Sequence, residues 1–286
     1  MSSKKLDEVK HRTEESPQTL VLVTGATAGI GAATATTLAE AGYAVIVHGR
    51  SEARCARVVE AIQTQGGTAR ADLAEFSSFT QVHALADRLA SQNIDIVINN
   101  AGVWMNEARE TEDGFEMTWQ VNYLAPFLLT LRLLPTLLQR ANARVINISS
   151  SGHHSGRIHF DDVNLRHGFS DIRAYCQSKL ANVLFTQELA RRTQGTSLIT
   201  HAIDPGAVTT QLLARTGFSP PAAKPAEETV ERWLTAVLGP EGGRSSGDYF
   251  GPNGKRSEPS THDTKLAARL WSMSESQIAT WANLAP

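Results

Sequence analysis

Short apolar runs of strand length alternate with longer helical patterns along most of the chain. The predicted strands are Leu20–Val23, Ala44–His48, Thr68–Ala71, Ile94–Ile98, Arg144–Ile148, Leu198–Ile203 and a last one near 246–250. Helical patterns cover about 32–41, 51–65, a segment ending near 91, 114–140, 175–192, 226–238 and the C-terminus. Runs that are apolar throughout are typical of parallel strands with both faces covered. The alternation predicts an α/β fold: one doubly wound, mostly parallel, seven-stranded sheet flanked by helices.

The longest helical pattern, residues 114–140, is apolar on nearly every side. Such a helix must be covered on most sides, by the sheet and by a neighbouring helix or a second subunit. Pro126 and Pro135 interrupt its hydrogen bonding and should kink it. We therefore expect a homodimer or tetramer.

The first strand leads into a glycine-rich turn, Thr24–Gly31, which is followed by an Ala-rich helix. Glycine permits positive φ and lets a diphosphate approach the backbone closely. Free N–H groups at the helix start attract its negative charge. An ordinary glycine-rich turn is the alternative, but strand, turn and helix in this order favour nucleotide binding. Gly25, Gly29 and Gly31 follow G-x-x-x-G-x-G rather than the common G-x-G-x-x-G.

The end of the second strand indicates which nucleotide is bound. Arg50 lies 19 positions after Gly31, near the place where an acidic residue would bind the adenosine ribose of NAD. No acid occurs in His48-Gly49-Arg50. A guanidinium binds a 2′-phosphate in two-pronged fashion, so NADP(H) is favoured over NAD(H). The alternative is a solvated surface arginine.

Composition excludes several other classes of protein. The formal net charge of 286 residues is −2, which gives no reason to expect a nucleic-acid partner. Two cysteines suit a reducing compartment, and we expect a cytoplasmic protein. Residues 1–18 are polar, and we expect them to form a loose extension of a single domain at 19–286. The sequence contains no uninterrupted apolar stretch of about 18 residues, so we expect no membrane anchor. His153-His154 lacks a convincing third ligand, so we expect no metal site.

Several motifs together resemble the short-chain dehydrogenase/reductase family. In the family's order they are the glycine turn, Asn99-Asn100-Ala101-Gly102, Asn122, Ser150 within three consecutive serines, Tyr175 with Lys179, and Asp204-Pro205-Gly206. Positions i and i+4 of a helix share a face, so Tyr175 and Lys179 project into the same space. Residues 173–182, with tail segments 247–250 and 267–271, look particularly like the retinol dehydrogenase and WW-domain oxidoreductase branch.

The resemblance implies a Rossmann fold and an NADP(H)-dependent oxidoreductase that interconverts an aldehyde or ketone and an alcohol. Tyr175 would be the acid/base, and the ammonium of Lys179 should lower its pKa. Ser150 would hydrogen-bond the substrate oxygen, and Asn122 would hold a water that links Lys179 to solvent. The implied cofactor-binding residues are Gly25, Thr27, Gly29, Ile30, Gly31, Arg50, Asp72, Leu73, Asn99, Ala101, Gly102, Tyr175, Lys179, Pro205, Gly206, Val208 and Thr209.

Two other functions stay open. One is a non-catalytic NADP-binding regulatory protein, although such a protein is expected to have lost its Tyr, Lys or Ser. The other is an epimerase or dehydratase of the same fold, whose usual G-x-x-G-x-x-G turn this chain does not match. Residues 207–225, rich in Pro, Gly and small residues, should form a substrate lid. Residues 1–18 do not resemble the N-terminal membrane segment of several retinol dehydrogenases, which argues against a retinoid substrate.

Overall fold

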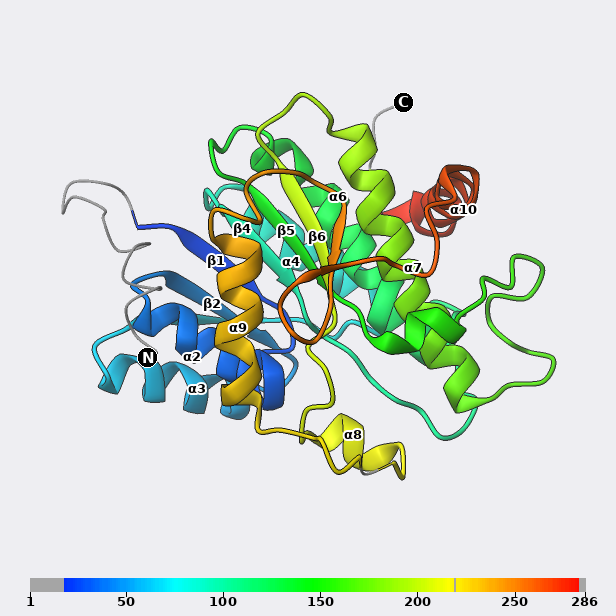
Figure 1. The fold of residues 1–286 in the computed structure, drawn as a ribbon, viewed down its shortest axis with the longest axis horizontal. Coiled ribbons are helices and arrows are strands. Elements are labelled where there is room, and N and C mark those ends of the chain that lie inside the picture. Colours follow the sequence, from blue (N-terminus) through cyan, green and yellow to red (C-terminus); the bar gives the residue numbers. More distant parts are fainter. Residues whose placement is uncertain (1–17, 219, 283–286) are drawn as a thin grey trace.

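A single sheet lies between two layers of helices in the computed structural model, which describes residues 18–218 and 220–282 (Figure 1). The strands are β1 (Leu20–Val23), β2 (Ala44–Gly49), β3 (Thr68–Leu73), β4 (Ile96–Asn99), β5 (Arg144–Ile148), β6 (Ile199–Ile203), β7 (Asp248–Phe250) and β8 (Arg256–Ser257). Their order in the sheet is β3-β2-β1-β4-β5-β6-β7-β8. All neighbours are parallel except β7 and β8. This order confirms the doubly wound Rossmann-type fold.

The sheet has eight strands instead of the predicted seven. The additional strand, β8, has two residues and pairs antiparallel with β7. Two residues are too few to show a hydrophobic period, which is why the sequence did not reveal it. Except for Gln18, the loose extension predicted for residues 1–18 lies outside the described residues.

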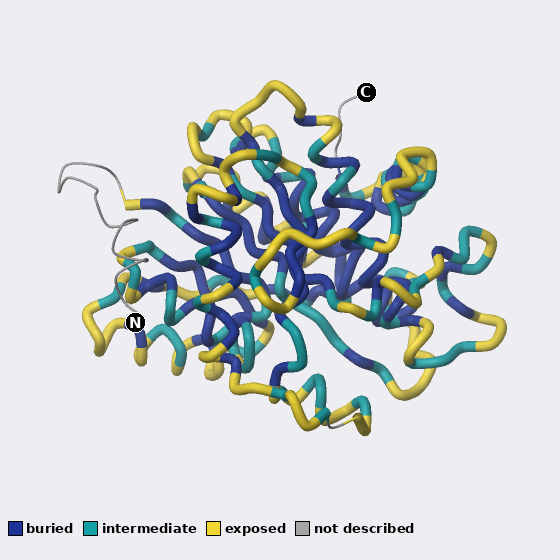
Figure 2. The backbone as a smooth tube through the Cα atoms, in the orientation of Figure 1, coloured by how far each residue is buried: buried dark blue, intermediate teal, exposed yellow. Residues whose placement is uncertain are grey.

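The helices divide between the two faces of the sheet. One face carries α2 (Gly29–Glu40), α3 (Glu52–Thr64) and α9 (Ala226–Leu238). The other carries α4 (Phe79–Ala90), α6 (Ala125–Leu137), α7 (Asp171–Arg192) and α10 (Thr264–Ala282). Along β1, Val21 and Val23 enter the first core and Leu22 the second, because successive side chains of a strand point to opposite faces. The central strands β1, β4, β5 and β6 are accordingly almost fully buried, while the edge strands β3 and β8 are largely exposed (Figure 2).

The helix predicted over 114–140 is three elements. A short α5 (Met117–Trp119) passes into a π-helix, Gln120–Leu124, and then into α6. In the π-turn the Ala125 N–H donates to the carbonyl of Gln120, five residues earlier. Pro126, which follows, has no N–H to continue an α-helical pattern. The wider turn therefore lies immediately before the first proline, and it contains Asn122.

The apolar faces of α6 are covered within the chain. Helix α10 packs against both α6 and α7. The Trp271 ring lies 5.0 Å from the ring centre of Phe127 and 5.9 Å from that of Phe185. In α6 only Pro135 is exposed. The helix thus needs no second subunit to cover it, and the homodimer or tetramer stays a prediction that light scattering of the 30.9 kDa chain can test.

Candidate active site

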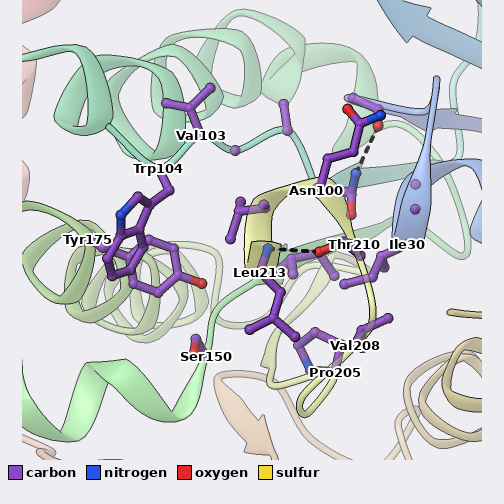
Figure 3. A pocket seen from close by; sticks show the side chains of 18 of the residues that line it. Ile30, Asn100, Val103, Trp104, Ser150, Tyr175, Pro205, Val208, Thr210 and Leu213 are labelled. Carbon is purple, nitrogen blue, oxygen red and sulfur yellow. Dashed lines mark hydrogen bonds between the residues drawn. The ribbon is translucent and has the colours of Figure 1, made fainter. Parts of the chain in front are cut away.

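The carboxyl ends of the parallel strands open into a cavity of about 970 Å³. The predicted residues that line it are Gly25, Thr27, Gly29, Ile30, Gly31, Arg50, Ala101, Gly102, Ser150, Tyr175, Lys179, Pro205, Gly206, Val208 and Thr209. Asp72, Leu73, Asn99 and Asn122 are not among its lining residues. Figure 3 shows the cavity, with Ile30 and Asn100 on one side and Tyr175 and Trp104 on the other.

Three positions in and next to the turn between β1 and α2 accept only glycine. Gly25 and Gly29 have φ of 64° and 52°, in the left-handed region that side chains rarely adopt. At Gly31 the backbone is ordinary and the constraint is space: a Cβ would lie 2.3 Å from the carbonyl oxygen of Gly25 and 2.5 Å from Nδ2 of Asn100. The turn therefore leaves bare backbone facing the cavity.

The start of α2 fits a diphosphate. Its N-cap residue is Ala28, which has no side chain to satisfy the first N–H groups. Gly29, Ile30 and Gly31, the first residues of the helix, line the cavity. Uncapped N–H groups and the helix dipole together favour a negatively charged group at this end. A dinucleotide would place its diphosphate here.

Asn100 and Thr24 tie the glycine turn to β4. The Asn100 amide donates to the carbonyls of Thr24 at 2.8 Å and Gly25 at 3.2 Å. The Thr24 hydroxyl accepts from the N–H groups of Asn100 and Ala101. Asn99 points into the protein instead, where its amide donates to Asn147 of β5 at 2.9 Å. Of the two asparagines, Asn100 therefore lies on the cavity wall, and Asn99 ties two strands together.

Asp72 and Leu73, which were expected to bind the cofactor, do not line the cavity. Strand β3 continues through both residues, and Arg88 of α4 donates to the Asp72 carboxylate at 2.7 and 3.0 Å. This ion pair holds Asp72 beside α4 rather than on the cavity wall. Glu75 lies on the wall instead, and its carboxylate is 3.1 Å from the guanidinium of Arg50.

His48 supports the turn from β2. It is buried, and its Nδ1 accepts from the Gly25 N–H at 3.3 Å. Burial lowers the pKa of His48 to about 4, so the ring is neutral and Nδ1 is free to accept. The sequence gives no sign of this role, because a strand pattern alone does not show which ring atom faces the turn.

Strand alternation separates the three serines after β5. Ser149 is buried, and its hydroxyl donates to the carbonyl of Lys179 at 2.9 Å. Ser150 Oγ accepts from the Gly152 N–H at 3.2 Å, and Ser150 lines the cavity together with Tyr175. Ser151 is exposed. Ser150 is therefore the serine that the structure brings together with Tyr175.

The pKa of Tyr175 is raised, whereas the sequence led us to expect a lowered one. Burial raises it to about 12, and the neighbouring Ser150 hydroxyl only partly offsets this. The ammonium of Lys179 lies 5.4 Å from the centre of the phenol ring and donates to the carbonyl of Ile148 at 3.0 Å. Loss of solvation is the main cause of the raised pKa and the Asp204 carboxylate adds to it, so the phenol is protonated at neutral pH.

Lys179 is itself buried, with 4% of its surface exposed. Burial lowers its pKa to about 8, and the nearby Asp204 carboxylate opposes that change. The lysine is thus predominantly charged at pH 7. Asp204 also accepts from the Gly206 N–H at 2.8 Å, which holds the Asp-Pro-Gly turn at the end of β6.

The side chain of Asn122 joins two segments behind the cavity. Its Oδ1 accepts from the Val103 N–H at 2.7 Å, and its Nδ2 donates to the Val103 carbonyl and to Ser178 Oγ. It thereby connects the loop after β4 to α7, next to Lys179. Its role in a water relay stays a prediction.

Trp104 also lines the cavity, although no motif in the sequence predicted it. Its ring centre is 4.9 Å from that of Tyr175, and it is buried. In Figure 3 the indole packs on the phenol while the phenol oxygen points into the cavity. A tryptophan two positions after Asn-Asn-Ala-Gly was the only available signal, and nothing local indicated its partner.

The predicted lid begins and ends at a pair of backbone hydrogen bonds. The Thr209 N–H donates to Lys224, and the Lys224 N–H donates to Ala207. Between them lies α8 (Gln211–Arg215), which has no buried residue, and Leu213 and Phe218 line the cavity. In Figure 1 this segment extends away from the sheet. Its position suits a cover for the substrate, and its movement stays a prediction.

Comparison with known proteins gives consistent results. The model of the short chain dehydrogenase family matches residues 19–218. Human retinol dehydrogenase 12 is 39% identical over 276 residues, which cover 90% of this chain and 85% of that protein. An uncharacterized protein from Mycobacterium paratuberculosis has a TM-score of 0.77 and 32% identity, covering 92% of this chain and 94% of that one. An NADP-bound 3-oxoacyl-(acyl-carrier-protein) reductase from Agrobacterium tumefaciens has a TM-score of 0.68 and 26% identity, covering 82% and 93%. Across residues 18–218 and 220–282, none of the helices has the length and apolarity needed to cross a bilayer.

Proposed function

Because this chain belongs to the short chain dehydrogenase family and is similar to the retinol dehydrogenases, we propose that it is an NADP(H)-dependent oxidoreductase that interconverts an aldehyde or ketone and the corresponding alcohol. One observation carries this proposal. Ser150, Tyr175 and Lys179 line the same cavity as the glycine turn that fits a dinucleotide. A hydride donor and a proton donor can therefore act on the same carbonyl group of a substrate.

The division of labour follows from the protonation states. The cofactor supplies the hydride when it is bound. The phenol of Tyr175 provides the proton for the oxygen of the reduced carbonyl, and the Ser150 hydroxyl donates a hydrogen bond to the same oxygen. Lys179 keeps a positive charge near the site, which favours the phenolate that forms when the proton leaves.

The raised pKa of Tyr175 suits the role of proton donor. A phenol with a pKa of about 12 is protonated at pH 7 and is ready to donate. Alcohol oxidation would first require that the buried phenol lose its proton. The net direction follows the ratio of NADPH to NADP⁺, so our inference that the protein acts mainly as a carbonyl reductase rests on the choice of NADP(H).

Arg50 and Arg54 support the choice of NADP(H). Both line the cavity beyond the end of β2, where the adenosine ribose would lie, and both are exposed. A 2′-phosphate there would meet two guanidinium groups. The Glu75 carboxylate competes for Arg50, since the two side chains already form an ion pair at 3.1 Å. Binding of a 2′-phosphate would have to displace this carboxylate or share the guanidinium with it.

A substrate panel tests the proposal. The protein is mixed with NADPH and, one at a time, with aldehydes and ketones of increasing apolar size, and absorbance follows cofactor oxidation. The reverse reaction is measured with NADP⁺ and secondary alcohols. We expect turnover with at least one carbonyl. Tight binding of NADPH without turnover on any member of the panel would instead indicate a non-catalytic regulatory protein.

A further inference from the structure

His153, three residues after Ser150, is a buried histidine that makes two hydrogen bonds. Its side chain is fully buried in the 3-10 turn that follows β5. Its Nδ1 lies 2.7 Å from the carbonyl oxygen of Ser150. Its Nε2 lies 3.1 Å from the backbone nitrogen of Ser260. Both ring nitrogens are therefore used.

These two partners define the proton position on the ring. A carbonyl oxygen can only accept, so Nδ1 must carry a proton and donate to Ser150. A backbone N–H can only donate, so Nε2 must be bare and accept from Ser260. Burial lowers the pKa of His153, which agrees with a neutral ring at pH 7. The ring is thus held as the Nδ1–H tautomer.

Ser260 belongs to the segment between β8 and α10, 107 positions from His153 in the sequence. Figure 1 shows this segment crossing in front of α7 on its way to α10. The His153 ring also packs on Tyr249 of β7, with ring centres 4.6 Å apart. The loop that carries Ser150 is thereby fastened to the C-terminal part of the chain.

We propose that His153 is a positioning residue for the active site: its Nδ1–H holds the backbone of Ser150, and the Ser260 N–H selects the tautomer that can do so. The inference rests on the proposed function, because Ser150 is assigned there as the donor to the substrate oxygen. A rigid Ser150 backbone fixes where its hydroxyl lies relative to Tyr175. Small errors in such an arrangement reduce turnover more than they reduce binding.

The tautomer is tested first, in the wild-type protein and without any substrate. Two-bond ¹H–¹⁵N correlation spectra of imidazole-labelled protein distinguish a protonated ring nitrogen from a bare one. For His153 we expect a protonated Nδ1 and a bare Nε2 that stay unchanged from pH 8 to pH 6. The opposite tautomer, or a ring that becomes charged in this range, would overturn the inference.

A pair of variants then separates the two hydrogen bonds. In His153→Asn the shorter amide can still donate to the Ser150 carbonyl but cannot reach Ser260. In His153→Gln the longer amide can accept from the Ser260 N–H, but it cannot donate to the Ser150 carbonyl as Nδ1 of His153 does. The control is His154→Asn, because His154 is adjacent in the chain, stacks on His153 at 3.9 Å and is exposed.

We expect kcat on the identified carbonyl to fall roughly ten- to a hundredfold in His153→Gln, with the Kd of NADPH unchanged. His153→Asn should retain most of the wild-type kcat, while hydrogen exchange shows that the Ser260 amide has lost protection. Equal losses of kcat in the two folded variants would overturn the proposal, as would equal losses in His154→Asn. A wild type without turnover would instead contradict the proposed function. The tautomer and the Ser260 protection would then still show whether His153 holds the loop.

Discussion

The two ends of the cavity are built in different ways. The dinucleotide end, around the glycine turn, is bare backbone: its shape depends on Gly25, Gly29 and Gly31 and on an uncapped helix start. The catalytic end, around Tyr175, consists of buried side chains whose protonation depends on what surrounds them. Changes at the first end should therefore alter cofactor affinity. Changes at the second should alter chemistry and its dependence on pH.

The largest expected effect is at the catalytic end. Tyr175→Phe removes the proton donor and keeps the ring that packs on Trp104. We expect kcat to fall at least roughly 10²- to 10⁴-fold, the usual contribution of a general acid. The Kd of NADPH should change little. Tyr43→Phe, a partly buried tyrosine outside the cavity, is the control. Near-wild-type turnover by Tyr175→Phe would show that another group delivers the proton.

This contrast also explains what the sequence could predict. Gly31 was recognisable because a Cβ there would meet the Gly25 carbonyl at 2.3 Å, so the motif records a local steric requirement. Tyr175 and Lys179 were recognisable because helix geometry places residues four apart on one face. Such features depend on a few neighbouring residues. The strands and helices that carry them also follow local patterns and could be predicted for the same reason.

Features that depend on distant segments were not predictable. The pKa of Tyr175 is raised by burial, which no local pattern reveals. Asp72 is held by Arg88 of α4, 16 positions away, and Glu75 lies on the cavity wall instead. The contact between His153 and Ser260 joins residues 107 positions apart. The covering of α6 by α10 likewise required the folded chain.

The second effect concerns stability at the catalytic end. Lys179 has an ordinary pKa of 10.5 and a folded-state pKa of about 8. Below pH 8 the buried ammonium is charged in both states, so its desolvation destabilises the fold by about 3 kcal/mol. From pH 8 to 10.5 the unfolded chain binds more protons, and this penalty diminishes as pH rises.

Lys179→Met should therefore be inactive and yet more stable than wild type at pH 7, by up to about 3 kcal/mol. The carbonyl of Ile148 keeps a donor in this variant, because Asn182 also donates to it. Urea unfolding of both proteins at several pH values measures the gap, which should narrow from pH 8 toward pH 10.5. A gap independent of pH would show that Lys179 has its ordinary pKa in the fold and that its burial carries no such penalty.

A third effect sharpens the dinucleotide end. Arg50→Ala removes a charge-assisted contact of about 1.5 to 3 kcal/mol, so the Kd of NADPH should rise roughly ten- to a hundredfold and that of NADH very little. Arg54 on the same wall would soften this loss. Arg57→Ala is the control, because Arg57 is exposed on α3 and does not line the cavity. Equal losses for both cofactors would make Arg50 an ordinary surface residue.

The smallest effect comes from the partner of Arg50. Glu75→Gln keeps the shape of the side chain and removes the carboxylate that competes for the guanidinium. Exposed ion pairs contribute about 0 to 1 kcal/mol, so the Kd of NADPH should fall up to roughly fivefold, and that of NADH less. Fluorescence titration of both cofactors measures the difference. Weaker NADPH binding would show that Glu75 assists the site instead of competing in it.

The central claim is that the dinucleotide end and the catalytic end of the cavity act on the same carbonyl group. Transfer of a labelled hydride tests this most directly. NADPH deuterated at the transferable position of C4 is mixed with the carbonyl identified in the panel, and mass spectrometry follows the alcohol. We predict one deuterium in the alcohol for each NADPH oxidised by the wild type, and essentially none with Tyr175→Phe under the same conditions. Alcohol without the label, or NADPH oxidised without alcohol, would contradict the account.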